Sequence, residues 1–146
     1  MDIPQSLIDQ AMRQEVRSGD VYKVSMTIED GITPKGGYSS RKKFFIVLGF
    51  DDDGNIYGGV VINSKINPNL SATITDFCMP IKKEVYPFLD HNSFVNCTKL
   101  KTPTANKLLA GEKVGEISQE DCDLIVGTVI NSPHETKARL RQFGLI

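Results

Sequence analysis

The spacing of apolar residues along this chain of 146 residues changes from a helical to a strand period and back again. Over residues 4–16, apolar side chains recur every three to four positions, which predicts an amphipathic helix that ends at Ser18 and Gly19. Over residues 22–28, apolar and polar side chains alternate. This period of two predicts a strand with one buried face.

Further extended segments follow, separated by turns. Apolar runs or alternation predict strands over residues 43–50, 55–62, 73–81 and 93–100. The sequence Asp51-Asp52-Asp53-Gly54 predicts a tight hairpin between the first two, because Asp-Gly accepts the positive φ of such turns. Gly58-Gly59 indicates a bulge or bend, and residues 29–40 and 63–72 are expected to be loops.

After Pro103 the pattern becomes helical. Ser118 is expected to cap a helix whose apolar stripe is Cys122, Ile125, Val126, Val129 and Ile130. A capping box with proline at the first helical position, Ser132-Pro133-His134-Glu135, predicts a second helix.

These elements indicate one mainly β domain with added helices, built as a small curled sheet or partly open barrel of about five to seven strands. Its expected parts are an N-terminal helix over residues 1–17, a barrel over 18–103 and a C-terminal helical part over 104–146.

Composition and charge narrow the possible functions. The chain carries 17 basic and 18 acidic side chains, so contact with nucleic acid must come from a local patch. Cys78, Cys97 and Cys122 are odd in number and lie in apolar contexts, which predicts reduced core cysteines in a reducing compartment. Without a signal peptide or an apolar run of about 18 residues, the expected location is the cytoplasm, with no membrane partner.

The basic triplet Arg41-Lys42-Lys43 leads directly into the apolar run over residues 44–48. Cations fixed at the end of a buried strand form a potential anion site, and phosphate is the commonest biological anion. The alternative is that the triplet only keeps a strand end solvated. The pairs Lys82-Lys83 and Lys99-Lys101 could join it on one face, beside Tyr38 or Tyr86 as stacking partners for bases, or be scattered solvated lysines.

The order of several short motifs resembles that of a known family. They are residues 17–21 opening the first strand, a glycine-bearing loop, the basic residue entering residues 44–48, and then residues 60–64, 93–97 and 115–118 before the amphipathic helix. In this order the chain resembles the MazF/PemK toxins. The resemblance implies an SH3-like barrel with added helices, usually a homodimer, that cuts single-stranded RNA and is blocked by a small antitoxin protein.

The resemblance also implies site residues. The family's catalytic Arg-Pro pair falls on Lys43 and Phe44, with Arg41 two residues earlier, and its Thr-Ser pair falls on Asn63 and Ser64. Lysine keeps the charge of arginine but lacks the planar fork that binds phosphate through two hydrogen bonds. The implied catalytic residues are Lys43, Arg41 and Ser64. The implied RNA-binding residues are Lys42, Asn63, Asn96, Thr98 and Lys99, of which Asn96 and Thr98 stand where some relatives carry an arginine and an aspartate as acid and base.

Other chemistry has less support in the sequence. His91 lies in an Asp-His-Asn turn, where a solvated turn residue is favoured over a catalytic one, and His134 is expected to be structural. Zinc-ligand spacing, an EF-hand and a phosphate-binding glycine motif are absent, so neither metal nor cofactor is expected. Three functions stay open: an active, metal-independent ribonuclease, a catalytically degenerate relative that binds nucleic acid or protein, and an interaction domain without a nucleic-acid role.

Overall fold

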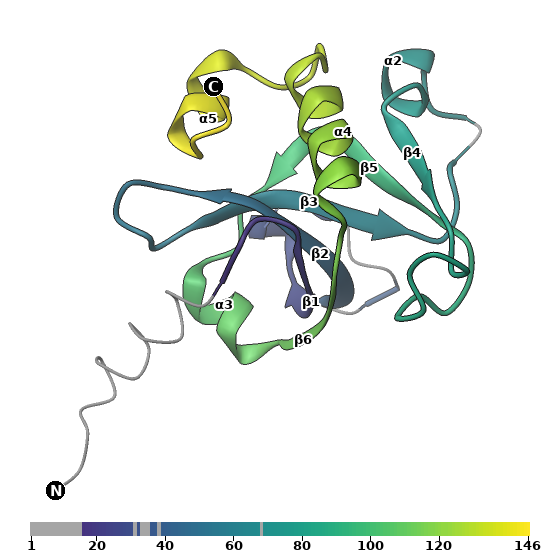
Figure 1. Ribbon diagram of the computed structural model, residues 1–146, viewed down its shortest axis with the longest axis horizontal. Coiled ribbons are helices and arrows are strands. Elements are labelled where there is room, and N and C mark those ends of the chain that lie inside the picture. The colour runs from purple at the N-terminus through teal and green to yellow at the C-terminus, as the bar shows by residue number, and fades with distance from the viewer. Residues whose placement is uncertain (1–15, 31, 33–35, 38, 68) are drawn as a thin grey trace, which may run out of the picture.

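The computed structural model describes residues 16–30, 32, 36, 37, 39–67 and 69–146, so residues 4–15 of the predicted N-terminal helix lie outside it. Six strands are described: β1 Asp20–Met26, β2 Arg41–Phe50, β3 Tyr57–Asn63, β4 Cys78–Ile81, β5 Ser93–Lys101 and β6 Glu112–Glu116. The helical elements are η1 Ile28–Asp30, α2 Ala72–Thr75, α3 Ala105–Ala110, α4 Gln119–Ile130 and α5 Lys137–Gln142 (Figure 1).

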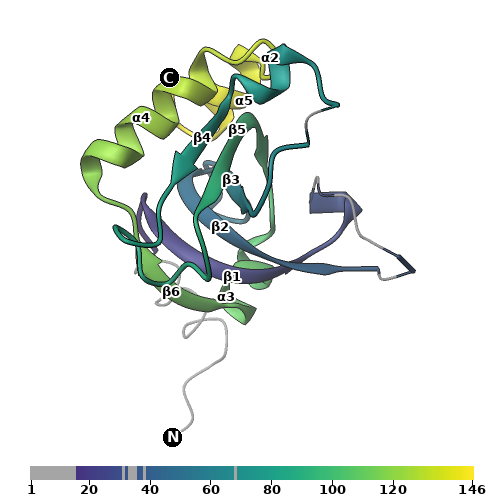
Figure 2. The same ribbon diagram turned by 90° about the vertical axis from the view of Figure 1, so that its right-hand side faces the viewer.

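The strands form one antiparallel sheet in the order β4-β5-β3-β2-β1-β6. Since β4 and β6 are its two edges, the sheet is open. In Figure 1 and Figure 2, α4 and α5 lie on one side of the sheet and α3 lies on the other. This arrangement confirms the prediction of a mainly β fold with added helices.

Apolar side chains fill both faces of the sheet. On one face, Ile46 and Val60 belong to the same core as Ile125 of α4. On the other face, Phe45 belongs to a smaller core with Leu108 of α3. Because successive side chains of a strand point to opposite faces, a strand buried on both faces is an unbroken apolar run, as residues 44–48 are.

The predicted hairpin between β2 and β3 is confirmed. Gly54 has a φ of +67°, and its N–H donates to the carbonyl of Asp51 at 3.0 Å. The Asp51 carboxylate accepts from the backbone N–H groups of Asn55 and Ile56 at 2.9 and 3.2 Å. The aspartate triplet is therefore a hairpin tip, in which the first carboxylate closes the turn.

The bend predicted at Gly58-Gly59 is also present. The strand register shifts between β2 and β3 near Gly49, and between β3 and β5 after Gly59. A Cβ atom at Gly59 would lie 2.0 Å from the carbonyl oxygen of Ile46, so only glycine allows the two strands to approach this closely.

Two predictions that concern strands were wrong. The strand expected over residues 73–81 begins only at Cys78, because the preceding residues form the short helix α2. The part expected to be helical after Pro103 contains β6, which pairs with β1 at Val21 and Gly115. The β6 sequence, EKVGE, is mostly polar because an edge strand needs little burial, so its local pattern gave no strand signal.

β5 bulges away from β3 after Asn96. Asn96 pairs with Val61 and Lys101 pairs with Gly59, so residues 97–100 lie opposite the single residue Val60. The segment that follows α4 holds this bulge in place. The Ser132 hydroxyl donates to the carbonyl of Thr98.

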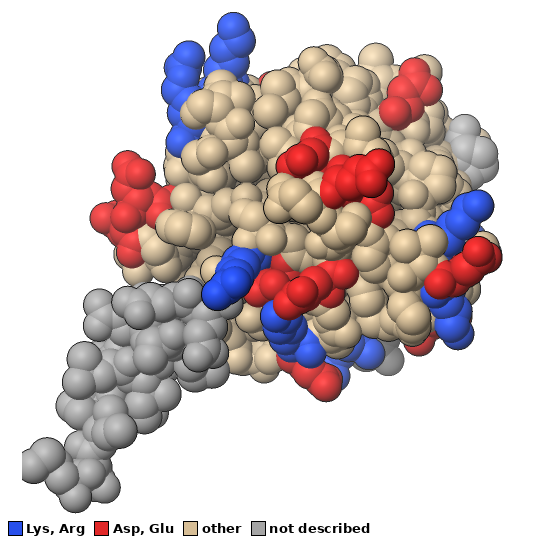
Figure 3. Space-filling view, in the orientation of Figure 1, with Lys and Arg blue, Asp and Glu red and all other residues tan. Residues whose placement is uncertain are grey.

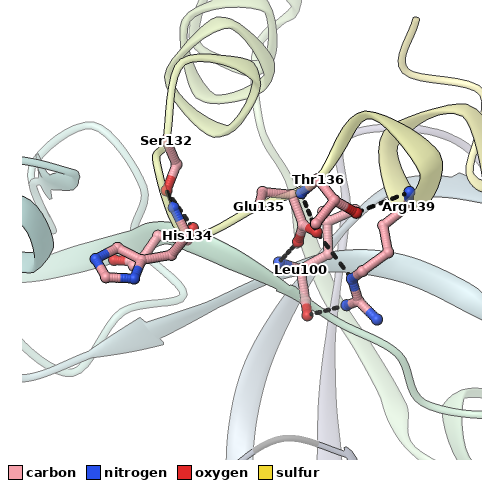
Figure 4. A network of polar contacts seen from close by, with 7 residues as sticks. Leu100, Ser132, His134, Glu135, Thr136 and Arg139 are labelled. Carbon is pink, nitrogen blue, oxygen red and sulfur yellow. Dashed lines mark hydrogen bonds and ion pairs between the residues drawn. The ribbon is translucent and has the colours of Figure 1, made fainter.

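The predicted capping box over residues 132–135 is also wrong, because its side chains bind the backbone of β5. The helix begins at Lys137, and its N-cap is Thr136, whose hydroxyl accepts from the N–H of Arg139 at 3.3 Å. Figure 4 shows that Glu135 points instead to the backbone of Leu100 in β5. Ser132 and Glu135, which are able to cap a helix, instead bind backbone groups of β5 at the bulge, where β5 does not pair with β3. The cap of α4 by Ser118 is as predicted, with its hydroxyl accepting from the N–H of Asp121 at 3.2 Å.

The cysteines are free thiols, as predicted: Cys97 and Cys122 are buried, and Cys78 is partly buried. Burial, with a smaller contribution from Cys78, raises the pKa of Cys97 to about 12. Within the described residues, none of the helices has the length and apolar character needed to cross a membrane.

Candidate functional site

The basic triplet forms the first three residues of β2, two residues earlier than the predicted start of this strand. Strand alternation places Arg41 and Lys43 on the face that carries Phe45, and Lys42 on the opposite face. Lys43 has only 9% of its surface exposed, whereas Lys42 is exposed. The triplet therefore supplies cations to both faces of the sheet at the point where its apolar cores end.

A cavity of about 230 Å³ opens on the face of Lys43; we call it the asparagine cavity. It is lined by side chains from β2, β3 and β5 and from one loop residue: Arg41, Lys43, Val61, Asn63, Asn96, Lys101 and Ile32. It thus joins the predicted residues Arg41, Lys43, Asn63 and Asn96.

The amide oxygens of both asparagines accept hydrogen bonds from the chain itself. Lys43 Nζ donates to Asn63 Oδ1, and the backbone N–H of Thr98 donates to Asn96 Oδ1 at 3.1 Å. Because an ammonium and a backbone N–H can only donate, both amide orientations are determined. In each amide the oxygen already accepts one hydrogen bond, and the NH2 group adds N–H donors to a cavity that Arg41 and Lys101 also line.

Lys101 adds a third cation that sequence reasoning did not include among the site residues. Burial lowers the pKa of Lys101, and the positive charges of Lys99 and Arg139 lower it further, while Glu135 opposes them. A bound anion would offset both the burial and the repulsion. The electrostatics of the asparagine cavity therefore favour an anionic ligand.

A second cavity, of about 390 Å³, adjoins the first because Arg41 and Lys43 line both; we call it the histidine cavity. Its lining comes from β1, β2 and β3 and from the segment that enters β5: Lys23, Arg41, Lys42, Lys43, Phe44, Ile62, Ser64, Asp90, His91 and Ser93. All three predicted catalytic residues, Arg41, Lys43 and Ser64, line it.

One wall of the histidine cavity is aromatic. Lys23 Nζ lies 5.8 Å from the ring centroid of Phe44, and Phe44 packs edge-on against Phe88 with centroids 5.7 Å apart. The cation and the ring are held together by this contact and by the β1–β2 pairing of the same two residues.

His91 is exposed in the turn before β5, as predicted, yet it lines this cavity. Its Nδ1 lies 3.1 Å from the carbonyl oxygen of Asn92 and 3.2 Å from the hydroxyl of Ser93. The Ser93 hydroxyl in turn donates to the carbonyl of His91 at 2.9 Å. Sequence reasoning missed the position of His91 because the triplet lies about 50 residues away in the chain.

Other predicted binding residues lie elsewhere. Within the part of the chain that the structure describes, Thr98 and Lys99 line neither cavity. Both belong to the β5 bulge, and the hydroxyl of buried Thr98 donates to the carbonyl of Ile74 at 3.4 Å.

Tyr86 is buried, and its hydroxyl donates to the carboxylate of Asp121, so it is not a stacking partner for bases. Tyr38 lies outside the described residues.

The positive and negative charges of the whole chain nearly cancel, with 17 basic and 18 acidic side chains. On the face seen in Figure 3, acidic and basic side chains are interspersed. Any nucleic acid must therefore be attracted by the local cations of the two cavities, which agrees with the net charge of -1. Among the described residues, no group of three or more His, Cys, Asp or Glu side chains is placed to hold a metal ion.

Comparison with models of protein families gives no match for this chain, and comparison with curated protein sequences gives none either.

Proposed function

We propose that this chain is a MazF/PemK-like protein that binds single-stranded RNA and cuts it as the endoribonuclease of a cytoplasmic toxin-antitoxin pair. The observation that carries the proposal is the asparagine cavity, where Arg41, Lys43 and Lys101 lie beside two asparagine amides whose oxygens already accept hydrogen bonds. Positive charges together with amide N–H donors suit the phosphate oxygens of a nucleic-acid backbone.

In this proposal, Lys43 and Arg41 hold the phosphate whose bond is cut, and no metal takes part. A ribose hydroxyl attacks that phosphate, and the two cations stabilise the negative charge that develops on its oxygens. Ser64 lines the adjoining histidine cavity and orients the same phosphate through its hydroxyl. A homodimer and a small antitoxin that covers the cavities complete the proposal, as the resemblance implies.

A second candidate is a relative that binds RNA without cutting it. The observation that favours it is the state of Lys43, which is 9% exposed and already donates to Asn63. An ammonium held in this way can attract phosphate, but it lacks the planar fork that grips two phosphate oxygens at once. Binding without cleavage separates this candidate from the first.

The test measures binding of single-stranded RNA at several salt concentrations, together with cleavage of the same RNA. We expect affinity to fall steeply with salt, because binding to phosphates releases counterions. Lys43→Met keeps the apolar stem and should lower both the affinity and, by about one unit, the slope of log Kd against log salt. The control is Lys137→Met, since Lys137 is exposed on α5 and lines neither cavity.

Salt-independent binding, or equal losses in the two variants, would remove the nucleic-acid role. Intact RNA with salt-dependent binding would favour the second candidate. Expression of the chain alone tests the toxin role, because a toxin should arrest growth and be relieved by co-expression of the small protein encoded beside it.

A further inference from the structure

The histidine cavity contains a titratable side chain that the proposed function leaves unused. The chain has two histidines, and His91 lines the cavity that also receives Arg41, Lys43 and Ser64. The residues assigned so far bind phosphate but do not accept a proton near neutral pH, because lysine and arginine are charged and serine does not titrate.

The hydrogen bonds of His91 determine which ring nitrogen carries the proton. Nδ1 faces the carbonyl oxygen of Asn92, which can only accept, so Nδ1 must donate. The second contact of Nδ1 agrees, because the Ser93 hydroxyl gives its own proton to the His91 carbonyl and is left to accept. In neutral His91 the proton is therefore on Nδ1 and the lone pair is on Nε2.

Nε2 is available for chemistry. Among the residues that the structure describes, none is hydrogen-bonded to this nitrogen. Ser93, which contributes to the orientation of the ring, has only 6% of its surface exposed and is fixed as the first residue of β5. An imidazole oriented by its own backbone, with one unprotonated nitrogen, has the arrangement of a general base.

The surroundings of His91 favour an anionic substrate. The charged groups that line the cavity with it are Lys23 of β1, Arg41, Lys42 and Lys43 of β2, and Asp90 beside it in the chain. Four cations against one carboxylate attract phosphate to the same cavity as the imidazole. The aromatic ring of Phe44 adds a surface for an unpaired base.

We propose that His91 is the general base of this site, a role that rests on the proposed cleavage of RNA. His91 Nε2 takes the proton of a ribose 2′-hydroxyl, and the 2′-oxygen forms a bond to the adjacent phosphorus. The bond from phosphorus to the 5′-oxygen breaks with its electron pair, and that oxygen takes a proton from water. The products are a 2′,3′-cyclic phosphate and a free 5′-hydroxyl, with no oxidation or reduction.

The experiment compares His91→Asn with His134→Asn on a single-stranded RNA substrate from pH 5 to 9. His134 is the matched control, because its Nε2 lies 3.1 Å from the hydroxyl of Thr73 and it lines neither cavity. We expect kcat/KM of the unaltered protein to rise over the range in which histidines titrate, about pH 5 to 8. His91→Asn should lower kcat by about 10²- to 10⁴-fold and should remove this rise with pH, while its Kd for RNA changes little. His134→Asn should keep the kcat of the unaltered protein and its rise with pH.

The possible outcomes are distinct. If His91→Asn cuts RNA as fast as the unaltered protein, the general base is another group and the proposed function stands without His91. If activity falls but keeps its pH profile, or falls in step with the melting temperature, His91 acts only through structure. If the unaltered protein binds RNA and never cuts it, cleavage is refuted, and the role of His91 with it.

Discussion

The carboxylate of Glu135 accepts a hydrogen bond from the backbone N–H of Leu100 at 2.8 Å, across 35 positions of sequence. Its other oxygen accepts from Arg139 Nε at 2.8 Å and from the N–H of Thr136 at 2.9 Å. Arg139 also donates to the carbonyl of Leu100 at 2.9 Å (Figure 4). Two side chains thus take the place of a neighbouring strand where β5 bulges away from β3.

Glu135→Gln should lower the free energy of unfolding by about 2 to 3 kcal/mol. The Glu135 side chain has no exposed surface, and an amide N–H group would face donors that a carboxylate now satisfies. Urea unfolding followed by circular dichroism measures the change. Glu84→Gln is the control, because Glu84 is exposed, and equal effects of the two variants would show that the contact with Leu100 is not structural.

Two glycines should respond to alanine in opposite directions. A Cβ atom at Gly49 would lie 2.0 Å from the carbonyl oxygen of Phe143, so Gly49→Ala must displace the segment after α5 and should cost about 2 to 3 kcal/mol. Gly127 lies inside α4, and a Cβ atom there meets nothing within 4 Å. Gly127→Ala should therefore stabilise the protein by about 0.5 to 1 kcal/mol. Thermal unfolding of both variants tests the pair, and a stabilising Gly49→Ala would contradict the close packing.

Stability should fall at alkaline pH because of Cys97. Its thiol has a pKa of about 12 in the folded chain against 9.0 when exposed, so the unfolded state ionises first as pH rises. Below pH 9 the thiol is protonated in both states and has no effect; between pH 9 and 12 it should cost about 1.4 kcal/mol per pH unit.

Unfolding free energies at pH 8 and pH 10.5 measure this effect. Cys97→Ala should show a smaller decrease between the two values than the unaltered chain. Val95→Ala removes a buried side chain from the same strand without removing a titrating group, so it should keep the full decrease. Parallel decreases in all three proteins would assign the effect to other residues.

Lys43→Arg should increase binding to single-stranded RNA severalfold at constant salt, because a guanidinium can donate to two phosphate oxygens. If the second candidate function is correct, cleavage should stay absent while affinity rises. Fluorescence anisotropy with a labelled oligonucleotide measures the affinity. A loss of binding without a change in melting temperature would show that the contact from Lys43 to Asn63, rather than the charge, shapes the cavity.

The sequence predicted the elements whose pattern is local. Four elements have an apolar period or a capping residue within their own sequence, and each was predicted within a few residues: β1, β2, β5 and α4. β6 was missed because its place depends on pairing with β1 at the other end of the sheet. The capping box failed because Ser132 and Glu135 meet Thr98 and Leu100 only after the chain has folded.

The site residues, too, were predicted only where the signal lies in the order of residues along the chain. Arg41, Lys43, Asn63 and Asn96 were predicted from a resemblance in order along the chain, and the structure brings them to one cavity. Lys101 and His91 were not assigned to the site, because their positions depend on tertiary structure. Lys101 reaches the asparagine cavity through the bulge of β5, and His91 reaches the histidine cavity because β5 pairs with β3, beside β2.

The pairing of β1 with β6 has a consequence for how the protein is made. β1 is translated well before β6, and Val21 of β1 pairs with Gly115 of β6, so one side of β1 stays unpaired until β6 has been synthesised. The cations of both cavities, up to Lys101, are translated before that sheet edge is complete. Chains that still lack β6 would then carry the side chains of the site without the finished sheet that holds them, which delays any activity until β6 has been synthesised.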